Sequence, residues 1–196
     1  MAVPCPRCGR EYDVTLFQFG RTIHCTCGAR VGLEKRIRLP DDAKPPTFAV
    51  DAMLGGLARW LRILGYDTAY DPRIEDEALV RRSAEEGRWI LTRDARLPRE
   101  WTVEGYLLLE ADEPLDQLRE VVERLALRPR EEHAFTRCPG CNGFLEQVDA
   151  AEVEDEVPER VLARHSVFRR CPGCGQVYWE GSHVGRIRER IGDLLE

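Results

Sequence analysis

The middle of the chain alternates short apolar runs with longer stretches of helical period. A helix over residues 52–64 is predicted because one face carries Leu54, Leu57, Trp60, Leu61 and Leu64. Further helices are predicted over residues 77–87, 114–127 and 183–195. Short apolar runs predict strands at residues 47–50, 69–70, 89–92 and 106–109. Strands and helices that alternate on this scale predict an α/β fold, in which helices cover a small parallel sheet.

The eight cysteines occur as four close pairs, CPRC, CTC and two copies of CPGC. A short gap lets a tight turn direct two thiolates at one ion, and nearby proline and glycine favour such turns. A tetrahedral zinc ion takes two such pairs from two loops. We therefore expect two zinc sites, one at Cys5, Cys8, Cys25 and Cys27, the other at Cys138, Cys141, Cys171 and Cys174.

Other uses of these cysteines are less favoured by the sequence. The N-terminus lacks an apolar signal core, so secretion and structural disulfides are not expected. A redox-active pair normally opens a helix after an apolar strand, and these pairs do not follow that pattern. His24 is an alternative ligand beside Cys25, although a plain loop residue is the simpler interpretation. Sites filled by four thiolates leave no position for water, so both zinc ions are expected to be structural.

Composition and charge place the chain among soluble globular proteins, which we expect to be cytoplasmic. Apolar residues make up 43% and charged residues 33%, with a formal net charge of -6. No apolar run approaches the roughly 20 residues of a membrane helix. Residues 1–47 are the basic part, with 8 basic and 5 acidic side chains. The acidic total disfavours nucleic-acid binding by net charge alone, but a local basic face is compatible with it.

The cysteines and prolines also divide the chain into predicted domains. The stretch PDDAKPP at residues 40–46 is typical of a linker. We predict an N-terminal zinc ribbon over residues 1–39, a linker over 40–47, an α/β domain over 48–130, and a second ribbon with a final helix over 131–196.

Three aspartates stand where predicted strands end or helices begin. Asp51 follows the first strand, Asp76 opens the second helix and Asp94 follows the third strand. Ligands of parallel α/β sheets bind beyond the carboxyl ends of the strands. Clustered carboxylates repel one another unless a cation lies between them, and oxygen ligands suit Mg²⁺ or Mn²⁺. The same positions also suit helix caps and turns, so spacing alone does not separate a cap from a metal ligand.

Several longer strings closely resemble the mut-seven C-terminal RNase domain family. They are FAVDAMLGGLARWLRILGYDTAYD, DEALV, WILTRDARL, RCPGCNG and RRCPGCGQVYWEGSH, in the family's order over roughly residues 48–190. The resemblance implies a PIN-like fold with an appended zinc ribbon and a metal-dependent RNase site. It implies that the catalytic acids and metal ligands are Asp51, Asp76 and Asp94, and that the ribbon's zinc ligands are Cys138, Cys141, Cys171 and Cys174.

The chain departs from the family pattern in two places. Arg96 stands where PIN-like sites often carry a fourth acid, for which Asp112 or Asp116 is a candidate replacement. Residues 1–47 lie outside the pattern, so the N-terminal ribbon is predicted from its cysteines only.

Arginines near the aspartates are candidates for contacts with substrate phosphate. Guanidinium groups bind phosphate through two parallel hydrogen bonds. Arg93 is adjacent to Asp94, and Arg59 and Arg62 lie on the first predicted helix. A solvated helix face is the alternative for the last two.

The predicted function is hydrolysis of RNA by a cytoplasmic enzyme with a Mg²⁺ or Mn²⁺ ion, with the ribbons positioning RNA or a partner such as the ribosome. The first alternative is an RNA- or protein-binding adaptor in which the PIN-like domain is inert. A toxin of a toxin–antitoxin pair is a third interpretation, which the two ribbons disfavour. The oligomeric state is not predicted.

Overall fold

The computed structural model describes residues 2–32, 45–103 and 105–195 of the chain. They divide into two compact units. The first unit comprises Met1–Ala58 and Thr68–Gln117, and the second comprises Arg59–Asp67 and Leu118–Glu196. The predicted linker residues 40–44 lie outside the described residues.

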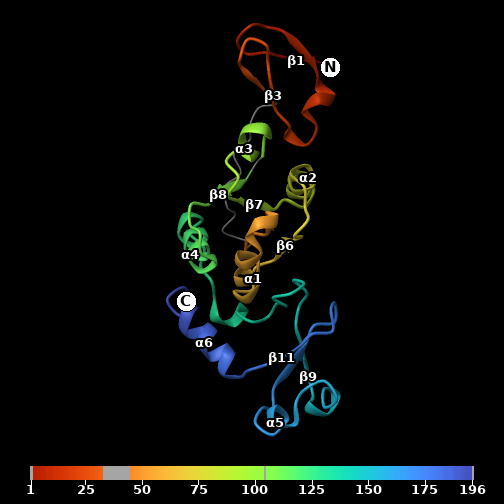
Figure 1. Cartoon of the computed structure of the whole chain (residues 1–196), viewed down its shortest axis with the longest axis vertical. Helices are drawn as coiled ribbons and strands as arrows, with labels where there is room; N and C mark the ends of the chain where they lie inside the picture. The colour runs from red at the N-terminus through yellow and green to blue at the C-terminus, as the bar shows by residue number, and fades with distance from the viewer. Residues whose placement is uncertain (1, 33–44, 104, 196) are drawn as a thin grey trace. The chain divides into compact units, whose positions relative to one another are not determined.

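The strands of the first unit are β1 (Ala2–Pro4), β2 (Glu11–Asp13), β3 (Ile23–His24), β4 (Arg30–Val31), β5 (Phe48–Val50), β6 (Thr68–Tyr70), β7 (Trp89–Thr92) and β8 (Tyr106–Leu108). Its helical segments are the 3₁₀ helices η1 (Val14–Gly20) and η2 (Ala52–Leu54), with α2 (Asp76–Glu86) and α3 (Leu97–Glu100). Two helices contribute residues to both units: α1 (Gly55–Ile63) and α4 (Pro114–Arg124). Figure 1 labels most of these elements.

A four-stranded parallel sheet lies at the centre of the first unit, in the order β6-β5-β7-β8 (Figure 1). Phe48, Ala49 and Val50 of β5 and Ile90 and Leu91 of β7 are almost completely buried. Continuous apolar strands are typical of parallel sheets that are covered on both faces. The predicted α/β class with a small parallel sheet is therefore confirmed.

The helix boundaries follow local signals in the sequence. Over residues 52–64 the predicted helix is split into η2 and α1, and its leucine face is buried at Leu54, Leu57, Leu61 and Leu64. The next helix, α2, ends at Gly87, which adopts the left-handed conformation at φ 65°. Sequence periodicity missed the short helix α3, because four residues are too few to show a period.

The first four strands form two short antiparallel hairpins, β1 with β2 and β3 with β4. Between them, the apolar run at Val14–Gly20 forms the 3₁₀ helix η1. Phe17 is buried with Val31 and with Cys5 and Cys25 in a small cluster. So few apolar residues make a marginal core, which is where a bound metal contributes most to stability.

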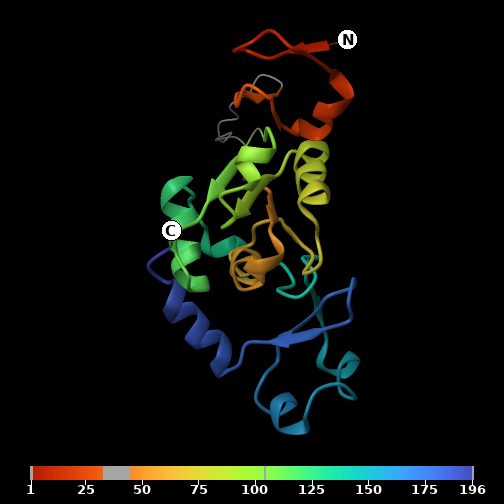
Figure 2. The ribbon, with the colours of Figure 1, turned by 45° about the horizontal axis from the view of Figure 1, so that its top comes forward.

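The second unit contains a three-stranded antiparallel sheet in the order β11-β10-β9 (blue and teal in Figure 2). Its elements are η3 (Glu131–His133), β9 (Glu146–Val148), η4 (Ala150–Glu152), α5 (Glu159–Leu162), β10 (Phe168–Arg170), β11 (Val177–Trp179) and α6 (Ser182–Ile191). Phe168 lies at the centre of a second small core with Val153, Val157 and Val177. The acidic stretch around residues 152–159 thus contributes two core valines.

Two adjacent glycines in α1 allow neighbouring side chains to approach the helix closely. A Cβ atom added to Gly55 would lie 2.6 Å from the Tyr70 hydroxyl, and one added to Gly56 would lie 2.6 Å from Cγ of Pro114. The glycine pair is therefore explained by packing, despite its cost in helix propensity.

Gly65 is the glycine at which substitution should cost most. It adopts φ 90°, and an added Cβ would lie 2.3 Å from the carbonyl oxygen of His133. We expect Gly65→Ala to lower the free energy of unfolding by about 3 kcal/mol, because strain and a backbone clash add.

The matched control is Gly185→Ala in α6, where an added Cβ meets nothing within 4 Å. Helix propensity predicts that it stabilises the protein by up to about 1 kcal/mol. Urea unfolding of both variants measures the difference, and equal stabilities would contradict this view of Gly65.

Candidate active site and metal centres

Asp51 and Asp94 are brought together by the two central strands of the parallel sheet. Asp51 directly follows β5, and its backbone N–H donates to the carbonyl of Leu91 at 3.0 Å. The fully buried Thr92 ends β7, and its hydroxyl donates to Oδ2 of Asp51 at 2.6 Å. The same hydroxyl accepts a hydrogen bond from the backbone N–H of Asp94 at 2.9 Å. Thr92 thus links the two predicted site residues.

The strand order explains why this edge is suited to a ligand. From the carboxyl end of β5 the chain runs to β6 on one side, and from the carboxyl end of β7 it runs to β8 on the other. These two connections therefore diverge at the carboxyl ends of β5 and β7, where α/β sheets commonly bind ligands. Asp51 and Asp94 stand at this point.

Asp76 lies within electrostatic range of Asp51 and Asp94. It is the first residue of α2 and is half-buried. Burial, followed by the charges of Asp51 and Asp94, raises the pKa of Asp76 above its ordinary value. Asp76 therefore lies within electrostatic range of the other two carboxylates.

The geometry does not support helix capping by Asp51 or Asp76. Asp51 precedes η2 but makes no side-chain capping hydrogen bond, and the residue before α2 is Glu75. Asp94 does act in a turn, since its Oδ1 accepts from the backbone N–H of Arg96 at 2.8 Å. The turn alternative is therefore supported for Asp94 alone.

Arg96, at the place of the missing fourth acid, is bound to Asp94. Its Nε lies 3.2 Å from each carboxylate oxygen, and its Nη2 lies 2.9 Å from Oδ2. These hydrogen bonds hold the pKa of Asp94 below its ordinary value. Of the three aspartates, Asp94 is thus the one with an arginine on its carboxylate.

The other candidate residues are exposed. Arg93 forms an ion pair with Asp112, one of the two acids considered as a fourth ligand. Asp116 is exposed on the first turn of α4, and Arg59 is exposed on α1. The roles of Arg59 and Arg93 toward phosphate remain predictions.

The chemistry of the three carboxylates fits a hard divalent cation. Their oxygens do not all lie within 4.8 Å of one another, a spacing that among the described residues only the two cysteine clusters reach. A cation at this edge would offset the negative charges that, after burial, raise the pKa of Asp76. Asp51, Asp76 and Asp94 would then be its protein ligands.

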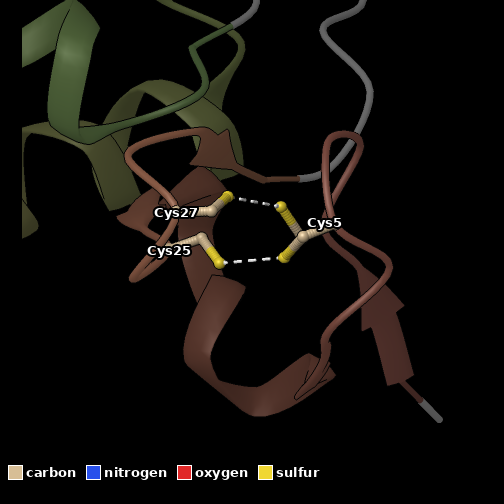
Figure 3. Close-up of side chains that lie close together, drawn as sticks. Cys5, Cys25 and Cys27 are labelled. Atoms are coloured by element: carbon tan, nitrogen blue, oxygen red, sulfur yellow. Dashed lines mark hydrogen bonds between the residues drawn. The ribbon is translucent and has the colours of Figure 1, made fainter.

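Both predicted cysteine clusters form, each with all four sulfurs within 4.8 Å of one another. In the N-terminal cluster, Sγ atoms lie 3.6 Å apart between Cys5 and Cys27 and 3.5 Å apart between Cys8 and Cys25. Figure 3 shows the sulfurs of Cys5, Cys25 and Cys27 facing one another.

The C-terminal cluster has the same form. Its Sγ atoms lie 3.6 Å apart between Cys138 and Cys174 and 3.2 Å apart between Cys141 and Cys171. All eight cysteines are free, and a disulfide would need about 2.05 Å between sulfurs. Zn–S bonds of about 2.3 Å in a tetrahedron suit separations of this size. The donor sets therefore fit zinc, and His24 is exposed outside the N-terminal set.

A tyrosine hydroxyl acts on one sulfur in each cluster: Tyr12 on Cys25 and Tyr178 on Cys138. In the N-terminal cluster, the backbone N–H of Cys27 and then the Tyr12 hydroxyl lower the pKa of Cys25 to about 5. Such a sulfur is ionised at neutral pH, as a zinc ligand must be.

In the C-terminal cluster the Tyr178 hydroxyl lies 3.2 Å from Sγ of Cys138. Burial raises the pKa of Cys138, but the Tyr178 hydroxyl and the backbone N–H groups of Cys141 and Gly140 outweigh it and lower the pKa to about 7. Tyr178 is therefore in direct contact with a predicted zinc ligand.

Arg62 has a structural role that the sequence did not reveal. It was expected to face phosphate or solvent, but only 4% of it is exposed. Its Nη1 donates to the carbonyl of Pro139 at 3.1 Å and to that of Gly140 at 2.8 Å. Arg62 therefore holds the turn between Cys138 and Cys141, and the expected role is corrected.

Arg137 and Asn142, which flank the same turn, form hydrogen bonds with residues that follow α1. Nε of Arg137 donates to the carbonyl of Gly65 at 3.1 Å, and Nδ2 of Asn142 donates to Asp67 at 2.9 Å. The guanidinium of Arg137 also covers the ring of Phe144 at 4.1 Å. The C-terminal end of α1 and the turn between Cys138 and Cys141 are thus joined by hydrogen bonds within the second unit.

The fold is a parallel α/β domain followed by a cysteine cluster that fits a zinc ribbon. A family model for the Mut7-C RNAse domain matches residues 46–191, and the chain belongs to that family. It is also 52% identical over 29 residues to the human protein "Exonuclease mut-7 homolog". That match covers 15% of this chain and 3% of the human protein. No solved structure matches the chain significantly.

None of the helices within the described residues has the length and apolar character that crossing a membrane requires.

The tyrosine contacts predict how tightly each cluster holds zinc. We expect Tyr178→Phe to weaken the C-terminal site about tenfold and to leave the N-terminal site unchanged, because a hydrogen bond to one ligand is lost. Tyr12→Phe should have the opposite pattern.

The release of zinc to a chromophoric chelator, measured on both variants, tests this prediction. Each variant serves as the control for the other. If Tyr178→Phe released both zinc ions as the wild type does, the proposed effect of the hydroxyl would be contradicted.

The raised pKa of Asp76 predicts a cost in stability when no divalent cation neutralises the aspartates. Because the pKa is higher in the folded than in the unfolded chain, this cost is absent at low pH and develops as pH rises through the folded value. Asp76→Asn should therefore raise the melting temperature at pH 7 by about 1–3 °C, and the gain should vanish below about pH 4.

Thermal melts at both pH values check the expectation, in buffer without added divalent cations and without chelators, so that zinc is retained. The control is Glu77→Gln, an exposed position in the same helical turn, which should not stabilise the protein. A lower melting temperature for Asp76→Asn at pH 7 would count against mutual repulsion at this site.

Proposed function

We propose that the chain is a metal-dependent ribonuclease whose site is formed by Asp51, Asp76 and Asp94. The observation that carries the proposal is the Thr92 hydroxyl, which binds the carboxylate of Asp51 and the backbone of Asp94 at the carboxyl edge of the sheet. The charges of both aspartates also act on Asp76. Membership of an RNAse domain family supports nuclease chemistry on nucleic acid.

Each residue has a defined task in this proposal. A bound Mg²⁺ or Mn²⁺ ion would supply Lewis acidity and lower the pKa of a water that attacks the phosphodiester. Thr92 holds the carboxylate of Asp51 in a single orientation through its 2.6 Å hydrogen bond. Asp76 places a third carboxylate at the start of α2. Arg59 and Arg93 are proposed to bind substrate phosphate.

RNA is the proposed substrate, and the ribosome is a candidate partner in the cytoplasm. The support for a binding role of the N-terminal ribbon is its charge, since residues 1–47 carry more basic than acidic side chains whereas the whole chain has a net charge of -6. The C-terminal ribbon is rigidly attached to the end of α1 through Arg62 and Arg137.

One observation favours a non-catalytic adaptor as the second candidate function. Arg96 replaces a potential acid and occupies the carboxylate of Asp94. An adaptor would bind RNA or protein through its ribbons and would not need a cation at the aspartates.

The proposed function predicts that Asp51→Asn and Asp94→Asn lower cleavage of single-stranded RNA with Mn²⁺ by about 100-fold or more, because each removes a metal ligand. Asp155→Asn, an exposed position in the C-terminal ribbon, is the matched control and should cleave like the wild type.

Gel assays of labelled RNA, with RNA binding measured in parallel, distinguish the two candidates. Equal cleavage by all four proteins would overturn the assignment of the site. RNA binding without cleavage by any of them would support the adaptor.

A further inference from the structure

Arg96 and Asp94 form an ion pair in which the two side chains differ strongly in their exposure to solvent. The side chain of Arg96 is 78% exposed, whereas that of Asp94 is 22% exposed. Asp94 is also tied to Thr92 through its backbone, but the guanidinium of Arg96 is bound to the carboxylate itself. An exposed arginine of this kind exchanges partners at low energetic cost.

This pair competes directly with a cation at the site. Arg96 contacts both oxygens of Asp94 through Nε, Nη2 and its backbone N–H. A divalent ion on either oxygen would lie beside a positive guanidinium, and Coulomb repulsion disfavours that arrangement. Binding of the ion therefore requires the guanidinium to leave.

The released guanidinium would be well suited to a phosphate group of RNA. Its planar fork binds phosphate oxygens through two hydrogen bonds, which a lysine does not reproduce. Arg93, the other arginine beside Asp94, is paired with Asp112, so its release does not free a carboxylate of the proposed site. The two arginines are thus held by different acids and are not interchangeable.

We propose that Arg96 is an exchangeable counter-ion of the nuclease site, bound to Asp94 in the metal-free chain and transferred to an RNA phosphate when a divalent cation takes the carboxylate. This inference rests on the proposed function. Each ligand removes the competitor of the other, so cation and nucleic acid bind with positive cooperativity, and the coupling is reciprocal.

The test measures Mn²⁺ affinity on the full zinc-loaded chain, from the electron paramagnetic resonance signal of free Mn²⁺. Without nucleic acid, Arg96→Gln should bind Mn²⁺ about fivefold more tightly than the wild type, since an exposed ion pair no longer competes. Arg99→Gln changes an exposed arginine of α3, the short helix that Arg96 precedes, and is the matched control that should bind like the wild type.

The same titration with a saturating single-stranded oligodeoxynucleotide measures the coupling. The probe carries the phosphates but lacks the 2′-hydroxyl of RNA. It should tighten Mn²⁺ binding by the wild type and by Arg99→Gln about fivefold, and should leave Arg96→Gln unchanged.

The possible outcomes separate this inference from the proposed function. Equal Mn²⁺ affinity of wild type and Arg96→Gln, with binding lost in Asp94→Asn, would overturn the role of Arg96 and leave the metal site in place. If neither the wild type nor Arg96→Gln binds Mn²⁺, the proposed function and this inference both fail.

Discussion

The hydroxyl of Thr92 is the contact on which the arrangement of the proposed site depends. Parallel pairing of β5 with β7 ends both strands at one edge, and the buried hydroxyl then binds Asp51 on one strand and the backbone of Asp94 on the other. A buried hydroxyl that both donates and accepts leaves little freedom in either neighbour. The two aspartates are therefore positioned by the sheet itself, and Asp76 joins them from the start of α2.

Charge balance is the second constraint at this edge. Burial and then the charges of Asp51 and Asp94 raise the pKa of Asp76, whereas Arg96 binds the carboxylate of Asp94 and offsets part of this effect on Asp76. A divalent cation would neutralise the remaining negative charge of the three carboxylates. The arginine in place of a fourth acid is consistent with a site whose affinity for metal is tied to the presence of a phosphate-bearing ligand.

Zinc at the two cysteine clusters would stabilise the parts of the chain that the central sheet does not stabilise. The N-terminal segment has only a small core around Phe17, and the C-terminal ribbon has another around Phe168. Each contains four sulfurs at separations that fit zinc, with a tyrosine hydroxyl on one of them. Arg62 and Arg137 join the turn between Cys138 and Cys141 to the C-terminal end of α1. Loss of zinc from the C-terminal cluster would therefore also loosen the end of that helix.

The sequence by itself determined the features that depend on near neighbours. Cysteine spacing predicted both clusters, apolar periodicity predicted the parallel α/β sheet, and strand ends located Asp51 and Asp94. Only the tertiary structure decided the partners of side chains that meet across long separations. Arg62 contacts a carbonyl 77 residues away, and Thr92 contacts Asp51 over 41 residues. Arg96 is close to Asp94 in sequence, but whether its flexible chain turns to that carboxylate or to solvent depends on the local turn. Periodicity and spacing report which face a residue occupies, whereas a hydrogen-bond partner is set by how distant segments pack.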